Sequence, residues 1–234
     1  LRFLAISANN LNEFYMVRVA GLRGQIEANV TAISQDGLSP QGQLDLIIKR
    51  AVRLMQNQQK CWRGIAAELR RIGIAVLEAE ELTDTDRIWL SAYFDREILP
   101  VITPIAVDPA HPFPFLPNFG HALLLALSRP SEGKTLHALV PMPQMLRRFI
   151  RLPGEGTRYV TLEGAIALHI DRLFPGDRVV AKGLCRVLRD GDLHVEEEAE
   201  DLVELYESAI LRRRRGNVIR LSVESTMPDE LRDL

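Results

Sequence analysis

Apolar side chains recur at alternating intervals of four and three residues between Leu44 and Ile72. This spacing is typical of a long amphipathic helix that buries one face. Ser39 and Pro40 suit the start of such a helix, and Gly73 suits its end. We therefore predict a helix of about 30 residues, roughly 45 Å long. Its stripe holds Leu44, Ile48, Ala51, Met55, Gln58, Trp62, Ile65, Leu69 and Ile72.

A second helical pattern comes earlier, from about Leu11 to Ile33. Asp36-Gly37 favours a short turn between the two helices, so they are expected to pack antiparallel. The apolar residues before Asn9 predict the end of a third helix. Residues 1–72 are therefore predicted to form an antiparallel helical bundle.

After Gly73 the pattern changes to short strands and short helices. Ile74–Leu77 suits a strand, and Thr83 with Asp86 resembles the capping box of a helix that runs to about Leu99. Four prolines within residues 108–117 exclude a regular helix there. Further strands are predicted at 121–128, 135–141, 157–161, 179–188 and 217–223, and further helices at 162–173 and 197–214. The expected fold is α+β, with a helical bundle at 1–72 followed by a mixed α/β domain at 73–234.

The composition is that of a folded chain. The 234 residues are 47% hydrophobic and 26% charged, and a net charge of −2 argues against a strongly basic nucleic-acid-binding protein. The longest apolar run, Ala122–Leu127, is too short to span a membrane, and no signal peptide is visible. The chain does not begin with Met, so we expect it to lie within a longer protein. Cys61 and Cys185 have no CxxC context, which favours a reducing compartment and leaves a disulfide between them unsupported.

The small net charge conceals an uneven distribution. Residues 1–72 hold 10 basic and 5 acidic side chains, a balance of +5, whereas residues 73–234 hold 19 and 26, a balance of −7. The positive part suits an anionic ligand through electrostatic steering. Nine acidic residues lie in Asp190–Glu207, and Arg212–Arg215 follow. Acids at the start and bases at the end of a solvated helix complement its dipole, so no ligand is needed to explain them.

Sequence motifs predict no catalytic residue and no metal-binding residue in this chain. It has no phosphate-binding glycine loop, no nucleophile elbow and no HExxH motif. We expect structural or solvent-exposed roles for its histidines, with ring packing for His111 and an apolar environment for His169; the full set is His111, His121, His137, His169 and His194.

Asn10 is the most informative polar residue. In one interpretation it caps the helix start, with Glu13 three residues later reaching back to the backbone. In the other, its exposed amide offers one donor group and one acceptor, which can match the edge of an adenine ring. The two interpretations are compatible.

Several stretches of the chain closely resemble bacterial polyphosphate kinase of the type that autophosphorylates a histidine. They occur in the expected order and cover essentially the whole chain. They are Arg2–Leu22 with its Asn-Asn-Leu-Asn-Glu-Phe motif, Ile102–Leu116, Pro143–Ile150, Leu173–Gly176, and Glu196–Leu202 with the arginine-rich segment after it.

The resemblance implies an N-terminal helical domain and a head domain of an enzyme that moves the γ-phosphate of ATP reversibly onto inorganic polyphosphate. It implies that Asn10 contacts the adenine of ATP, with Asn12 where the family usually has Asp. The phosphohistidine and the groups that bind Mg²⁺ would lie in catalytic domains outside this chain, so residues 1–234 alone are expected to be inactive. The resemblance further implies a homo-oligomer formed through the head domain, and a cytoplasmic location or peripheral attachment to the inner membrane.

Two alternatives of other classes remain open at this point. One is a non-enzymatic helical interaction or dimerisation module, in which the long helices form a docking rod. The other is nucleic-acid binding by the basic residues of 1–72, which the net charge of the whole chain argues against.

Overall fold

The computed structural model describes residues 1–108, 110–129, 134–191 and 216–234, and the chain forms two compact units. The first unit comprises 1–67, 117–119 and 187–221, and the second comprises 68–116, 120–186 and 222–234. Helices and mixed sheets together confirm the α+β fold class. The division of the chain into domains after residue 72 stays a prediction.

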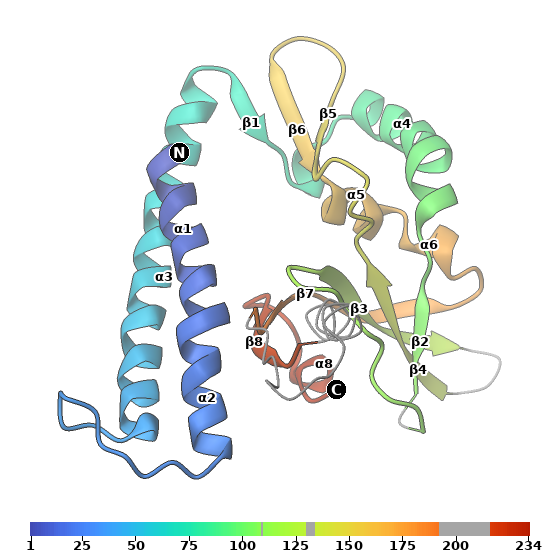
Figure 1. Ribbon diagram of the computed structural model, residues 1–234. Helices are drawn as coiled ribbons and strands as arrows, with labels where there is room; N and C mark the ends of the chain where they lie inside the picture. The colour runs from blue at the N-terminus through green and yellow to red at the C-terminus, as the bar shows by residue number, and fades with distance from the viewer. Residues whose placement is uncertain (109, 130–133, 192–215) are drawn as a thin grey trace, which may run out of the picture. The chain divides into compact units, whose positions relative to one another are not determined.

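The helices have the following bounds: α1 Arg2–Phe14, α2 Ala20–Glu27, α3 Pro40–Arg71, α4 Asp84–Tyr93, α5 Leu162–Leu168, α6 Ile170–Leu173 and α8 Asp229–Arg232. The strands are β1 Ile74–Val76, β2 Ile105–Val107, β3 His121–Arg129, β4 Lys134–Pro141, β5 Phe149–Arg151, β6 Thr157–Thr161, β7 Arg178–Arg189 and β8 Val218–Val223. Figure 1 labels these elements.

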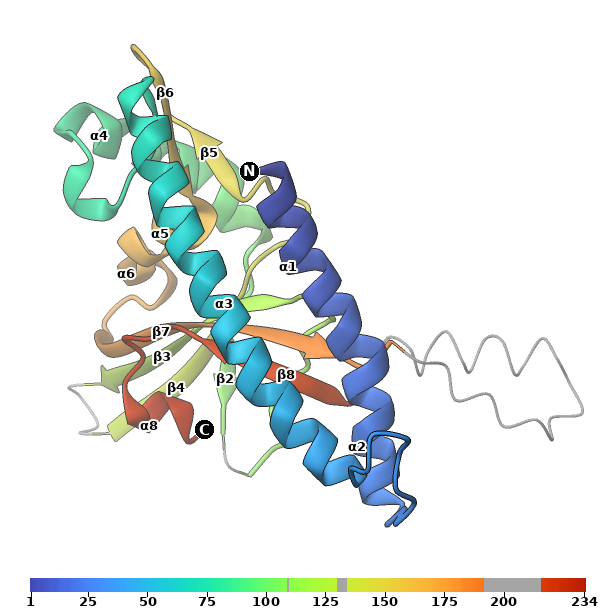
Figure 2. The same cartoon turned by 90° about the vertical axis from the view of Figure 1, so that its left-hand side faces the viewer.

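Helix α3 confirms the helix predicted from the heptad pattern. It begins at Pro40, and the Ser39 hydroxyl accepts a hydrogen bond from the Gly42 amide at 3.2 Å, which caps its start. It ends at Arg71, just before Gly73, whose φ of +81° favours glycine. Figures 1 and 2 show α3 running beside α1 and α2.

The earlier helical segment differs from the prediction at both ends. It begins at Arg2 and runs through Asn10 without a break, so the proposed cap at Asn10 and the separate third helix are both wrong. Helix propensity is a weak preference that neighbouring residues override, and the Asn9 amide donates to Glu13 one turn later at 3.2 Å. The segment ends at Glu27 rather than near Ile33, and Asn29 adopts a positive φ of 53° just beyond it.

A π-helical turn at Tyr15–Val19 joins α1 to α2, and it lies over the core of the first unit. The Arg220 guanidinium lies 5.2 Å from the centre of the Tyr15 ring. Ile48, predicted to belong to the buried stripe, is 43% exposed, and the neighbouring Ile47 packs against the core instead. The buried members of this core are Leu11, Tyr15, Val19, Ala20, Leu44, Ala51, Leu188 and Ile219.

The predicted strands of the second half of the chain are all present. The smaller sheet has the order β1-β6-β5, in which β1 is parallel and β5 antiparallel to β6. The larger sheet has the order β2-β4-β3-β7-β8, and β3 pairs antiparallel with both β4 and β7. The sequence did not indicate β2 and β5, which have three residues each; β1 is equally short, but it lies in the continuous apolar run Ile74–Leu77.

Helices α4, α5 and α6 cover the core of the second unit. The capping box of Thr83 and Asp86 is confirmed, and α4 continues into a π-helical turn at Phe94–Ile98 and a 3₁₀ turn at Leu99–Val101. The helix predicted at 162–173 is broken at His169 into α5 and α6. The most deeply buried side chains of this core include Leu90, Phe94, Ile98, Leu125, Val140, Val160, Ala165 and Ile166.

Some predictions fall on residues outside the described ranges. These are the helix at 197–214, the acidic run after Asp190, Arg212–Arg215 and His194.

In the part of the chain that the structure describes, no helix is long and apolar enough to cross a membrane. Cys61 and Cys185 are both free thiols, and burial raises the pKa of Cys185 to about 11.

Gly183 in β7 is predicted to tolerate no side chain. A Cβ there would lie 2.5 Å from Cε and 2.6 Å from Cγ of the buried Met227. We expect Gly183→Ala to lower the free energy of unfolding by about 1–3 kcal/mol in denaturant titrations. The cost should nearly vanish in a Met227→Ala background, where the space is free. Gly64→Ala is the control, because nothing lies within 4 Å of that position. An equal effect of Gly183→Ala in both backgrounds would contradict this account.

Asp86 is the one buried charged residue of the described chain, with 2% of its surface exposed. Burial disfavours its ionised form, but hydrogen bonds from Thr83 and Arg158, both at 2.7 Å, outweigh burial and lower its pKa below 3.8. A lowered pKa stabilises the fold above pH 3.8, and this contribution is lost as the pH falls through the folded-state value.

We therefore expect Asp86→Asn to lower the free energy of unfolding by about 2–3 kcal/mol at pH 7. The variant should also lose less stability than the wild type when the solution is acidified below pH 3.8. Asp84→Asn in the same helical turn, where the side chain is exposed, serves as the control. Parallel stability–pH curves for Asp86→Asn and the wild type would rule out this role.

Candidate functional site

Asn10 lies on an exposed face of α1 that borders a groove. Residues three, four and seven apart share one face of a helix, and Phe3, Ser7, Asn10 and Phe14 follow this spacing. All of them line the groove, together with Ile6 and Leu11. Asn10 is therefore presented from the middle of a regular helix rather than from its cap.

Helix α3 supplies the opposite wall of this groove. Ile47, Arg50, Ala51 and Leu54 line it from that side, and the volume is about 600 Å³. A volume of this size is within the usual range for small-molecule sites. All ten lining residues belong to the first unit.

Two buried side chains and one hydrogen bond hold the walls together. Leu11 from α1 and Ala51 from α3 are 9% and 5% exposed, and both belong to the core of the first unit. The Gln58 amide donates to the Ser7 hydroxyl at 2.9 Å, which joins the two helices near the groove. The small Ala51 side chain permits close approach of the helices, so the groove has a firm floor.

Three polar side chains line the groove, and two of them are available to a ligand. The Ser7 hydroxyl already accepts from Gln58. Within the described ranges, the Asn10 amide and the Arg50 guanidinium make no hydrogen bond and no ion pair. The other seven lining residues are apolar: Phe3, Ile6, Leu11, Phe14, Ile47, Ala51 and Leu54.

The apolar and polar residues that line the groove suit ligand binding rather than catalysis. An apolar floor favours a flat, weakly polar ring, and an amide can both donate to and accept from the edge of such a ring. The ten lining residues include no nucleophile paired with a base, and no pair of titratable groups. The groove therefore fits a ligand part that is held in place while chemistry occurs elsewhere.

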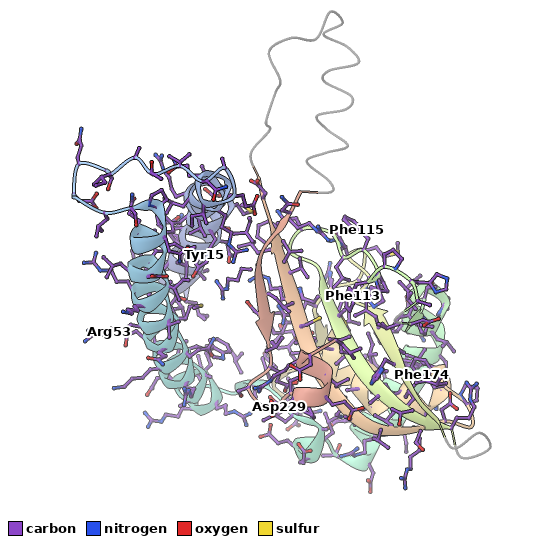
Figure 3. The ribbon with its side chains drawn as sticks, turned by 90° about the horizontal axis from the view of Figure 1, so that it is seen from below. Tyr15, Arg53, Phe113, Phe115, Phe174 and Asp229 are labelled. Atoms are coloured by element: carbon purple, nitrogen blue, oxygen red, sulfur yellow. The ribbon has the colours of Figure 1, made fainter. Side chains whose placement is uncertain are left out.

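The π-helical turn directly follows the groove-lining part of α1. Tyr15 begins this turn and is 6% exposed, and the Arg220 guanidinium covers its ring. Arg220 also donates to the Met55 sulfur of α3 at 2.8 Å. Figure 3 shows Tyr15 on the inner side of the helices, whereas Arg53 projects from the outer side of α3. π-Helical turns often occur beside functional sites. Arg220 links this turn to α3, because it contacts both the Tyr15 ring and the Met55 sulfur.

The described histidines do not form a second site. His169 stacks on Phe94 at 4.8 Å in the second unit, in line with its expected apolar environment. His111 is exposed beside Asp108 at 3.3 Å, so the expected ring packing is wrong. Among the described residues, no three His, Cys, Asp or Glu side chains lie close enough together to hold a metal ion.

The sequence did not single out the α3 wall of the groove. Ile47 and Leu54 are seven residues apart with Arg50 between them, on a flank of the heptad stripe. This second apolar pair is the sequence signal of the α3 wall, and it lies outside the heptad stripe that predicts the helix. Asn10 was found from its position in a motif, and its place in a groove required the structure.

Comparison with known families identifies both parts of the chain. A family model described as the polyphosphate kinase N-terminal domain matches residues 1–77. A second model, described as the polyphosphate kinase middle domain, matches residues 85–234.

Individual relatives agree with these matches. A polyphosphate kinase from Erythrobacter litoralis is 46% identical over 224 residues, which is 96% of this chain and 31% of the relative. One from Streptomyces coelicolor is 40% identical over 235 residues, which is 99% of this chain and 31% of the relative. The crystal structure of polyphosphate kinase from Porphyromonas gingivalis shares the fold, with a TM-score of 0.71 at 24% identity over 99% of this chain and 32% of that one. This chain thus spans about a third of the length of the curated relatives it matches.

Proposed function

Because the chain belongs to the polyphosphate kinase family, we propose that it is the nucleotide-facing N-terminal part of an enzyme that moves the γ-phosphate of ATP reversibly onto inorganic polyphosphate. In this proposal the groove between α1 and α3 forms one wall of the adenine pocket, and Asn10 contacts the base. The reacting phosphates and the phosphohistidine lie in parts of the protein beyond this chain.

The observation that carries the proposal is the position of Asn10 in an apolar groove. Adenine is flat and weakly polar, so its faces fit against side chains such as Phe14 and Leu54. Its edge carries an amino donor next to a ring-nitrogen acceptor, which an asparagine amide can meet with its oxygen and its NH₂ group. In the described ranges, the amide of Asn10 has no other partner.

The charge of the helical part supports the same proposal. Residues 1–72 carry a balance of +5, against −7 for the remainder. ATP and polyphosphate are both polyanions, so the net positive charge of residues 1–72 raises their local concentration and their rate of encounter. Positive charge here serves binding, and the transfer step needs a separate cluster of cations around the moving phosphoryl group.

Among the described residues, no three His, Cys, Asp or Glu side chains lie close enough together to hold a metal ion. In this proposal Mg²⁺ is held with the phosphates by residues of the catalytic domains. This chain would bind the base and orient the nucleotide, which lowers the entropic cost of aligning its phosphates. We also propose self-association through residues 73–234, and a cytoplasmic location or peripheral attachment to the inner membrane.

Replacement of Asn10 tests its role in the full-length enzyme. We expect Asn10→Ala to raise the KM for ATP about threefold to tenfold with little change in kcat, because one or two hydrogen bonds to the base are lost in ground state and transition state alike. Asn9→Ala is the matched control, since its side chain contacts Glu13 and lies outside the groove. An unchanged KM in steady-state assays of Asn10→Ala would show that Asn10 does not contact the base.

Residues 1–234 alone are expected to remain unlabelled when incubated with [γ-³²P]ATP. A histidine nucleophile needs a positioned γ-phosphate and clustered cations, whereas the groove is lined by no histidine and by a single cation, Arg50. The full-length enzyme under the same conditions should acquire acid-labile label. Acid-labile phosphate on any of the five histidines of residues 1–234 would contradict this expectation.

A further inference from the structure

We propose that Arg50 is a second base-contacting residue, whose planar guanidinium lies against the face of the purine that Asn10 holds by its edge. This inference rests on the proposed function, because it concerns the same groove. It assigns to α3 a part in nucleotide recognition that the motif around Asn10 does not provide.

The first support is the position of Arg50. It lines the groove from α3, on the wall opposite Asn10. Within the described residues its guanidinium makes no ion pair, and the acidic side chains Asp45 of α3 and Glu13 of α1 have other hydrogen-bond partners. Asp45 on the same helix accepts from Gln41 at 2.9 Å, and Glu13 on α1 accepts from Asn9 at 3.2 Å. Arg50 is thus a cation at an apolar site with its donors unused.

The second support is the character of the groove, which favours a base over a phosphate. Seven of its ten lining residues are apolar. A phosphate group placed there would give up water without finding enough donors, whereas an uncharged ring loses little. The part of a nucleotide that Arg50 meets in the groove is therefore its base.

The third support is the chemistry of the guanidinium group. It is planar, delocalised and weakly hydrated, and it stacks on aromatic faces, which the compact ammonium of lysine does not do in the same way. Asn10 then reads the edge of the base and Arg50 covers a face of it. Each contact comes from a different helix, and the helices are joined by Ser7 and Gln58 and by the core around Ala51.

The experiment uses the full-length enzyme with Arg50→Met, Arg50→Lys and Arg53→Met. Methionine keeps an unbranched apolar side chain and removes the charge and the plane, whereas lysine keeps the charge and removes the plane. Arg53→Met is the matched control, because Arg53 lies on the same helix but outside the groove, on its outer side (Figure 3). The readouts are kcat, the KM for ATP and the inhibition constant of adenosine in competition with ATP.

Arg50→Met is expected to raise the KM for ATP about threefold to tenfold, with kcat within about twofold of the wild type. The inhibition constant of adenosine, which has no phosphate, should rise by the same factor. Arg50→Lys should show most of this loss, and Arg53→Met should behave as the wild type. Unchanged thermal unfolding midpoints would confirm that the variants are folded.

Three results would overturn the proposal. An unchanged KM in Arg50→Met would show that the residue makes no contact. A raised KM for ATP with an unchanged adenosine constant, or full recovery in Arg50→Lys, would show that Arg50 acts on phosphate through its charge alone. Asn10→Ala, measured alongside, separates failure of the Arg50 proposal from failure of the proposed function. If it raises the KM while Arg50→Met does not, only the role of Arg50 fails; if the wild-type enzyme makes no polyphosphate from ATP, the proposed function fails as well.

Discussion

The packing of α1 against α3 is the interaction on which the candidate site depends. Leu11 and Ala51 both belong to the core of the first unit, and the hydrogen bond between Ser7 and Gln58 joins the helices about one turn away along α1 and about two turns away along α3. Neither helix presents a groove by itself, because the floor consists of residues from both. The same contacts that stabilise the helical pair therefore determine where Asn10 and Arg50 lie. Rigid helices position such groups more reproducibly than loops do.

This arrangement separates recognition from chemistry. The groove supplies apolar walls, one amide and one guanidinium, which are groups that bind and orient. Phosphoryl transfer requires a nucleophile and a cluster of cations, and the proposed function assigns both to regions beyond this chain. The second unit is built around a different core, in which Asp86 is held by Thr83 and Arg158. No residue of this unit lines the groove.

Most of the fold was accessible from the sequence, because its elements follow strong local rules. The heptad spacing predicted α3, the capping box predicted α4, and apolar runs such as Ala122–Leu127 predicted the central strands. The errors arose where weak local signals met tertiary packing. Asn10 looked like a helix cap, but the helix continues through it, because the segment before it extends the same amphipathic face. Strands β2 and β5 depend on their partners β4 and β6, which no pattern within three residues can reveal.

The candidate site was only half predictable for a related reason. Asn10 was identified from the family motif, whereas Arg50 lies 40 residues away on another helix and became relevant only when the two helices were placed side by side. A groove is a property of two packed surfaces. The spacing of residues along one of them indicates a face, but it does not indicate what the face meets.

The central claim is that the groove between α1 and α3 receives the base of ATP. The most direct measurement is a crystal structure of the full-length protein with a non-hydrolysable ATP analogue. The account predicts an adenine ring between the two helices, with the Asn10 amide within about 3.2 Å of its edge. An adenine ring bound elsewhere, with protein side chains filling the groove beside Asn10, would contradict it.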